Sequence, residues 1–230
     1  MELYNKYQPV TWDIGVIEAT PVDVAGAIQS LYAPPERLED ICHEAITINE
    51  ALLHMEPLGL ADKFLLIETK CGRTVMFGNA FYSMVQLPTW TAGENLGVSA
   101  YYVCNVPNTI SKDQRSGEFG ARILEYRKPE DPYGQKATFR IDVINDAGRW
   151  KFYRVGEKRP FEDEKAYRSF RKTDRFTVEM LVKYCRELGI PVYDRDWYSD
   201  NIITIHRTPL PDAKGLTFEE AQIELRIKKQ

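Results

Sequence analysis

The chain has 230 residues, of which 43% are hydrophobic and 28% are charged, and its formal net charge is −4. A chain of this size and composition buries a full hydrophobic core, so neither long disordered regions nor a scaffold of disulfides is expected. The four cysteines are widely spaced without a C-x-x-C pair, which excludes a zinc ribbon and a thioredoxin-like site. No signal peptide and no apolar run of about 18 residues is visible, so we expect a reduced, cytoplasmic protein without a membrane span.

The charge is unevenly distributed along the chain. Residues 1–110 carry 5 Lys/Arg and 13 Asp/Glu, whereas residues 111–230 carry 25 Lys/Arg and 21 Asp/Glu. Such a split indicates an acidic face and a basic face with different partners, unless the two halves neutralise each other across one fold. The sequence leaves both arrangements open.

The first quarter of the sequence predicts a strand, a helix and a mixed segment. A strand is expected at 12–19, and Thr20-Pro21 then begins a helix with a capping hydroxyl followed by proline. Between Glu36 and His54 apolar residues recur at helical spacing, but a β-branched run in the middle weakens a helix. We expect a helix to about Ala45, a break, and a short helix near 49–54.

From Lys63 onward the sequence predicts antiparallel β-structure. Strands are expected at 64–69, 74–77, 98–106, 119–127, 136–144 and 201–207. The clearest hairpin spans 137–153, with a turn at Asn145-Asp146-Ala147-Gly148. In its first strand apolar residues alternate with Thr138, Arg140 and Asp142, which predicts one packed and one solvated face.

Three helices are expected in the last third. Residues 162–172 predict a surface helix, acidic at its start and basic at its end, in accord with the helix dipole. Thr177 caps a helix that reaches Leu188 and ends at Gly189. The last helix starts at Thr217, which forms a capping box with Glu220.

These elements together predict an α+β fold, with a mostly antiparallel sheet and flanking helices. We expect a single domain over residues 1–230, with a possible subdivision near 108–117.

The stretch 149–176 is a candidate binding surface. It holds ten Lys/Arg, five Asp/Glu and seven aromatic residues. Cations beside aromatic rings are what a phosphate-bearing or acidic partner requires, although the same composition suits a solvated hairpin and a surface helix. The candidate anion-binding residues are Arg154, Lys158, Arg159, Arg168, Arg171 and Lys172.

The segment 193–200, YDRDWYSD, is a second candidate surface. Its aspartates could ligate Mg²⁺ or Ca²⁺, but the central glycine and terminal glutamate of an EF-hand loop are missing. Tyrosine and tryptophan beside acids suit a protein-binding hot spot, and the alternative is a loop anchored on its own core by Trp197. The candidate partner-binding residues are Tyr193, Asp194, Asp196, Trp197, Tyr198 and Asp200.

Metal and cofactor sites find little support in the sequence. His43, Glu50 and His54 would share one face of a continuous helix, but the expected break near residue 46 destroys that alignment. Phosphate-cradling glycine loops are absent. We therefore expect neither a metal nor a cofactor.

Catalytic residues are also not identified. The sequence lacks a G-x-S-x-G nucleophile elbow. Glu68, Glu125 and Asp142 could form a carboxylate pair in a β-lined cleft, but the sequence gives no distance between them.

The run Gly148-Arg149-Trp150-Lys151-Phe152, the triplet Pro160-Phe161-Glu162 and the run Asp174-Arg175-Phe176-Thr177 resemble a set of uncharacterised bacterial proteins. Residues 181–189 extend this resemblance, and residues 50–79 are similar to an earlier hairpin of the same set. The resemblance implies a bacterial cytosolic protein. It implies no reaction, cofactor or catalytic residue.

These observations favour a protein-binding module, namely a bacterial inhibitor of the immunity or antitoxin type that neutralises a cognate toxin. The charge split and the aromatic-charged segments suit electrostatically steered protein association, and the acidic half suits a basic toxin. One alternative is a motif-free enzyme acting on a small molecule or a nucleic acid. Another is nucleic-acid binding through 149–176, although the net negative charge disfavours it.

Overall fold

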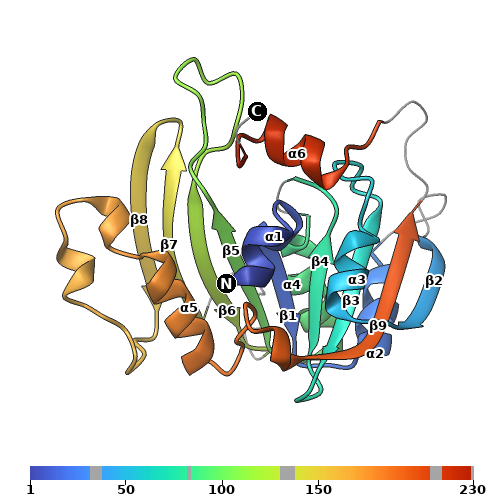
Figure 1. Ribbon diagram of the computed structural model, residues 1–230. Helices are drawn as coiled ribbons and strands as arrows, with labels where there is room; N and C mark the ends of the chain where they lie inside the picture. Colours follow the sequence, from blue (N-terminus) through green and yellow to red (C-terminus); the bar gives the residue numbers. More distant parts are fainter. Residues whose placement is uncertain (32–37, 82–83, 130–137, 208–213, 229–230) are drawn as a thin grey trace.

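The computed structural model describes residues 1–31, 38–81, 84–129, 138–207 and 214–228. These residues confirm the predicted α+β fold, because helices flank one antiparallel sheet of nine strands (Figure 1). The α-helices are α1 (Glu2–Lys6), α2 (Pro21–Gln29), α3 (Ile48–Leu53), α4 (Gln86–Leu96), α5 (Val178–Glu187) and α6 (Phe218–Glu224). The strands are β1 (Asp13–Ile17), β2 (Leu38–Ala45), β3 (Lys63–Thr69), β4 (Thr74–Gly78), β5 (Ala100–Val106), β6 (Ala121–Arg127), β7 (Phe139–Asp146), β8 (Arg149–Gly156) and β9 (Tyr198–Arg207).

The order of the strands places the two halves of the chain at opposite ends of the sheet. The order is β2-β9-β3-β4-β1-β5-β6-β7-β8, and every neighbouring pair is antiparallel. Strands β1 to β5 come from the acidic half, and β6, β7 and β8 come from the basic half. Apart from β9, which lies between β2 and β3, the charge split of the sequence therefore runs along the sheet.

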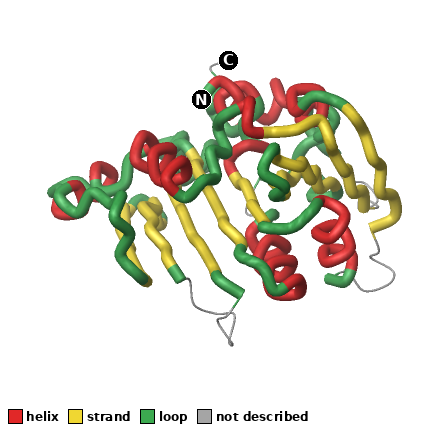
Figure 2. The backbone as a smooth tube through the Cα atoms, turned by 90° about the horizontal axis from the view of Figure 1, so that it is seen from below, coloured by secondary structure: helices red, strands yellow, loops and turns green. Residues whose placement is uncertain are grey.

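Helices cover the two faces of the sheet and enclose two apolar cores (Figure 2). On one face α1, α3, α5 and α6 pack over a core that includes Trp12, Leu65 and Leu181. On the other face α2 and α4 pack over a core that includes Ile17 and Met76. Burial of these side chains is the main stabilising contribution to the fold. No helix of the described residues has the length and apolar character needed to cross a membrane.

Local signals in the sequence predicted several elements correctly. The hydroxyl of Thr20 accepts a hydrogen bond from the backbone of Asp23 and caps α2. The hairpin of β7 and β8 closes through Ala147 and Gly148, whose φ angles of 48° and 89° fit a two-residue turn. The predicted caps at Thr177 and Thr217 begin α5 and α6, the latter with its capping box.

The helix predicted up to Ala45 is wrong. Residues 38–45 form the edge strand β2, which pairs with β9 from Leu38 opposite Arg207 to Ala45 opposite Asn201. The ladder of hydrogen bonds to a distant strand overrides the weak helical spacing. The short helix that was predicted near 49–54 is present as α3, and Thr47 caps it. The first two residues of the predicted segment lie outside the described part.

The surface helix predicted at 162–172 is also wrong. This segment contains only two short 3₁₀ turns, at Ala166–Arg168 and Lys172–Asp174. The Glu162 carboxylate accepts hydrogen bonds from the Arg154 side chain and the Arg159 backbone, while the Tyr167 ring packs on Phe152. These contacts to the neighbouring strand replace the regular bonding of a helix. The start of the strand predicted at 136–144 lies outside the described residues, and β7 follows from Phe139.

Candidate binding surfaces

The aromatic side chains of the 193–200 segment belong mainly to the core. Tyr193 and Tyr198 are only 8% and 5% exposed, and Trp197 is half-buried. The Tyr198 hydroxyl donates a hydrogen bond of 2.6 Å to the backbone oxygen of Val192, and the Tyr193 ring lies edge-on to Tyr4. The structure thus places these rings as anchors of the segment rather than as an open aromatic surface.

The three aspartates of the same segment are exposed but do not converge. Asp194 accepts a hydrogen bond from the backbone of Asp196, and it lines a pocket beside α1. Asp200 lies instead in a hollow at the end of β2 and β9, together with Glu44 and Glu68. In the part of the chain that the structure describes, no group of three His, Cys, Asp or Glu residues could hold a metal ion.

The hollow at the end of β2 and β9 has a volume of about 550 Å³ and is rich in carboxylates. The Glu68 carboxylate accepts a hydrogen bond of 2.7 Å from Asn201, and Glu44 lies 3.5 Å from the Nδ1 atom of His54. His43 reaches this hollow from β2, whereas Glu50 is engaged in the capping box of α3. The carboxylates make the hollow suited to a cationic side chain of a partner.

At the base of the 149–176 stretch, the predicted anion-binding cations are paired. Arg154 forms a two-pronged ion pair with Glu162, at 2.9 Å from Nε to Oε2 and 2.6 Å from Nη2 to Oε1. Lys158 pairs with Glu164, whereas Arg159 lies 3.9 Å from the Glu157 carboxylate and over the Tyr126 ring, and its Nε and Nη2 atoms have no hydrogen-bond partner among the described residues. These carboxylates neutralise Arg154 and Lys158, so this part has little capacity left for an external anion.

The Glu162 carboxylate makes the central contacts in this part of the stretch. Its side chain is 1% exposed, and it also accepts a hydrogen bond from the Tyr167 hydroxyl at 3.1 Å. Burial alone would raise its pKa, but hydrogen bonds from Arg154 and from the backbone of Arg159 outweigh this and lower the pKa. The segment that follows Glu162 is therefore fixed to β8 by a buried ion pair.

After the segment that Glu162 anchors, the stretch forms a projection. We call it the basic tip and define it by Arg168, Phe170, Arg171 and Lys172. It lies beside β8 at the left of Figure 1. Phe170 is 98% exposed, and none of the three cations forms an ion pair with a described residue. The Arg175 side chain donates a hydrogen bond of 2.8 Å to the Ser169 backbone and holds the tip in shape.

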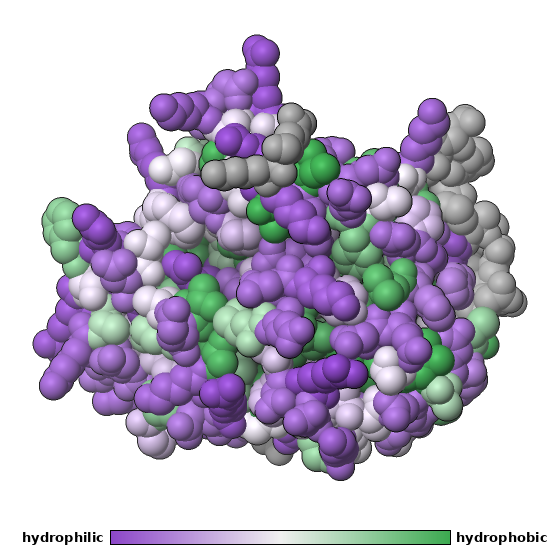
Figure 3. All heavy atoms as spheres, in the orientation of Figure 1, coloured by the Kyte–Doolittle hydropathy of each residue, from purple (hydrophilic) through white to green (hydrophobic). Residues whose placement is uncertain are grey.

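Sequence reasoning placed three of these cations among its candidates but gave Phe170 no separate role. In the sequence Phe170 follows Ala166 and Tyr167 at helical spacing, so it fits the predicted surface helix and nothing local marks it as exposed. Figure 3 shows hydrophilic residues over most of the face it displays, with apolar groups in small separate patches. Among the described residues Tyr153 and Phe170 are the exposed aromatic side chains, and Phe170 is by far the more exposed of the two.

Two of the predicted carboxylates meet in a buried network. The Arg140 side chain lies 2.9 Å from Glu125 and 2.6 Å from Asp142, and Arg127 lies 2.8 Å from Glu125. Glu68 is elsewhere, in the hollow at β9. The predicted solvated face of β7 is thus wrong at Asp142, which is 1% exposed because the ion pair allows its burial.

This network has the properties of a structural ion cluster. Burial raises the pKa of Asp142, and the neighbouring Arg140 opposes that rise. Glu125 is also 1% exposed, and both carboxylates are held by guanidinium groups. Carboxylates enclosed in this way do not reach a substrate, so the network gives no support to acid–base catalysis.

Comparisons with protein-family models, with curated proteins and with solved structures find no match to this chain. The geometry of the surfaces described above therefore carries the functional argument.

Proposed function

We propose that this protein is a bacterial, cytoplasmic protein-binding module, an inhibitor of the immunity or antitoxin type that neutralises a cognate toxin. The observation that carries the proposal is the basic tip, where Phe170 is 98% exposed on a segment that a buried ion pair fixes to the sheet. Because the backbone of this segment is already held, a partner that buries the ring has only its two side-chain torsions to fix. Such residues are typical hot spots of protein interfaces.

The charges of the tip favour a partner whose contact surface carries the opposite charge. Arg168, Arg171 and Lys172 are unpaired among the described residues and surround Phe170 along the chain. A partner recess with carboxylates at its rim and an apolar floor complements this arrangement. Because the acidic hollow lies at the opposite end of the sheet, the molecule has an electrostatic polarity that would orient an approaching partner.

Co-expression tests this proposal. The product of a toxin gene adjacent to this gene is expressed in bacteria alone and together with the protein, and growth is measured. We expect the wild-type protein to restore growth and Phe170→Ala to lose protection, because the anchor of the interface is removed. Lys158→Gln is the matched control, since it removes a cation that is already paired with Glu164.

Two results would contradict the proposal. If the wild-type protein does not protect against any adjacent toxin and binds none of their products, the inhibitor function is wrong. If the Phe170→Ala protein is folded and protects as well as the wild type, the basic tip is not the contact surface.

Nucleic-acid binding is a second candidate, because an exposed ring beside unpaired cations also suits a single strand. Fluorescence anisotropy with a labelled single-stranded oligonucleotide distinguishes the two functions. Binding that weakens steeply with salt and that requires Phe170 would favour the nucleic acid over a protein partner.

A further inference from the structure

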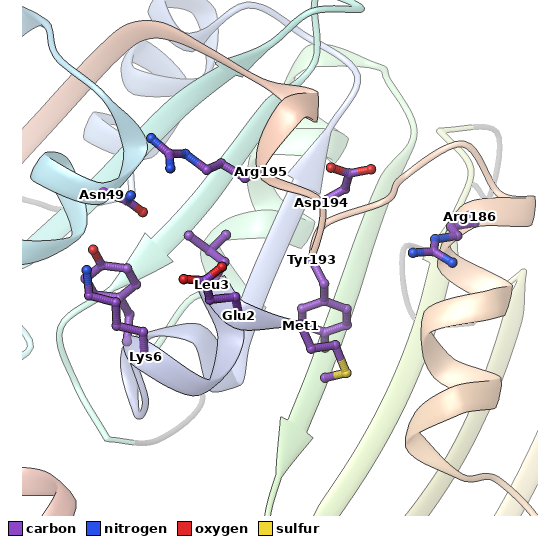
Figure 4. A pocket seen from close by; sticks show the side chains of 10 residues that line it. Met1, Glu2, Leu3, Lys6, Asn49, Arg186, Tyr193, Asp194 and Arg195 are labelled. Carbon is purple, nitrogen blue, oxygen red and sulfur yellow. The ribbon is translucent and has the colours of Figure 1, made fainter.

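A second site lies on the face of the sheet that carries α1. The pocket there has a volume of about 290 Å³ and is bounded by α1, the start of α3, the end of α5 and residues 193–195 (Figure 4). It does not include any residue of the basic tip. Its size suits a small molecule rather than a macromolecular chain.

Three of the five charged side chains that line this pocket are cationic. Lys6, Arg186 and Arg195 line it from three different elements, and Figure 4 shows Arg186 and Arg195 on opposite sides of it. None of these three forms an ion pair with a described carboxylate. The carboxylates of Glu2 and Asp194 also line the pocket without neutralising them.

The same pocket is lined by two tyrosines with unused hydroxyls. Tyr7 and Tyr193 are 1% and 8% exposed, and within the described residues neither hydroxyl has a hydrogen-bond partner. Both hydroxyl oxygens have almost no accessible surface and belong to the packed core, so they do not face the open volume of the pocket. The tyrosines therefore form part of the pocket wall, and the polar contacts for a ligand come from the charged side chains.

From these observations we infer that the pocket beside α1 binds a small oxyanion, that is, a compound with a phosphate or carboxylate group. Guanidinium groups recognise both groups through paired hydrogen bonds, and the Lys6 ammonium adds a third positive charge to the same pocket. Glu2 and Asp194 lie where they can accept hydrogen bonds from a hydroxyl or ammonium group on the rest of the ligand. The hollow at Arg154 offers no such site, because its main cations are already paired with Glu162 and Glu164.

Calorimetric titration of the full chain with inorganic phosphate tests the inference, with malonate as the carboxylate probe and sodium chloride at matched ionic strength as the reference. We expect saturable binding of at least one of the two probes, and the stronger probe identifies the oxyanion. The double variant Arg186→Gln/Arg195→Gln should weaken binding by about tenfold or more, since two charge-assisted contacts are removed. Arg171→Gln in the basic tip is the control and should bind as the wild type does.

Binding that is no stronger than with chloride, or that survives the double variant, would overturn the inference. The double variant should still neutralise the toxin, so the result is independent of the proposed function.

Discussion

The segment 193–200 and the basic tip both place aromatic residues beside charged ones in the sequence, but the structure treats their rings in opposite ways. The segment has three aromatic residues with three aspartates and one arginine, whereas the tip has Phe170 with three cations. In the first, Tyr193 and Tyr198 are buried, Trp197 is half-buried and the charged side chains are exposed. In the second, Phe170 is almost fully exposed and the charges beside it are unpaired among the described residues.

The difference follows from the position of each segment in the fold. Residues 193–200 connect α5 to β9 across the middle of a sheet face, where neighbouring elements cover their rings. The tip lies beyond the edge strand β8, where the sheet offers no further surface to pack against. An aromatic side chain is thus a core anchor or a binding anchor according to the number of elements around it.

The largest effect is expected from removing a ring of the first segment. Tyr198→Ala should lower the free energy of unfolding by about 3–5 kcal/mol, because it empties a buried site and removes the bond to Val192. Chemical denaturation of the two proteins measures the difference. A loss below about 1 kcal/mol would mean that the ring does not serve as a core anchor.

Breaking the buried ion pair at the base of the tip should have the next largest effect. Glu162→Gln leaves Arg154 without its charged partner, and the expected loss of unfolding free energy is about 3 kcal/mol. The control Glu164→Gln breaks an exposed pair with Lys158 and should cost less than about 1 kcal/mol. Equal losses in the two variants would contradict the assigned role of Glu162.

The same pair predicts a pH dependence. Because the folded protein lowers the pKa of Glu162 below the ordinary value of 4.5, the stabilisation is complete above that value and is lost as the pH falls through the folded pKa. The unfolding free energy of the wild type should therefore fall more steeply in acid than that of Glu162→Gln. Parallel pH profiles would show that the carboxylate is not stabilised by folding.

A smaller effect tests the position of Trp197. Burial opposes ionisation of the Cys71 thiol, but hydrogen bonds from Thr69 and Trp197 and the charge of Arg73 outweigh burial and lower its pKa. Trp197→Phe keeps a ring and removes the donor, so the pKa of Cys71 should rise. Iodoacetamide alkylation as a function of pH, in a Cys42→Ser background, measures this shift. An unchanged profile would mean that the indole does not contact the thiol.

The smallest effect on stability is expected at the tip itself. Phe170→Ala should change the free energy of unfolding by less than about 0.5 kcal/mol, because an exposed side chain makes few contacts in the free protein. Thermal and chemical denaturation should superimpose on those of the wild type. A clear destabilisation would show that the ring packs on the protein, and the comparison of the two segments would then fail.

Local signals predicted much of the fold. Thr20, Thr177 and Thr217 cap the helices they were expected to cap, and the Ala147-Gly148 turn closes the expected hairpin. Each of these features depends on residues within a few positions along the chain. Short-range hydrogen bonds and backbone preferences are present in the sequence itself.

The errors and the missed residues share a long-range cause. The strand state of residues 38–45 depends on β9, and the irregular state of 162–172 depends on Arg154 and Phe152 of the neighbouring strand. Phe170 and Phe161 look alike in the sequence, yet Phe161 packs on Phe139 and Phe170 contacts solvent. The pocket beside α1 is lined by both Lys6 and Arg186, and no local sequence pattern connects these two residues.

The place of β9 between β2 and β3 has a consequence for synthesis on the ribosome. Strands β2 and β3 emerge early, but they do not pair with each other and both wait for β9, which is translated after every other strand. Until then β3, which carries the apolar run Phe64 to Ile67, is paired with β4 on one edge and open on the other. Such an edge invites pairing with other chains, so we expect the nascent protein to be most prone to aggregation before its last strand closes the sheet.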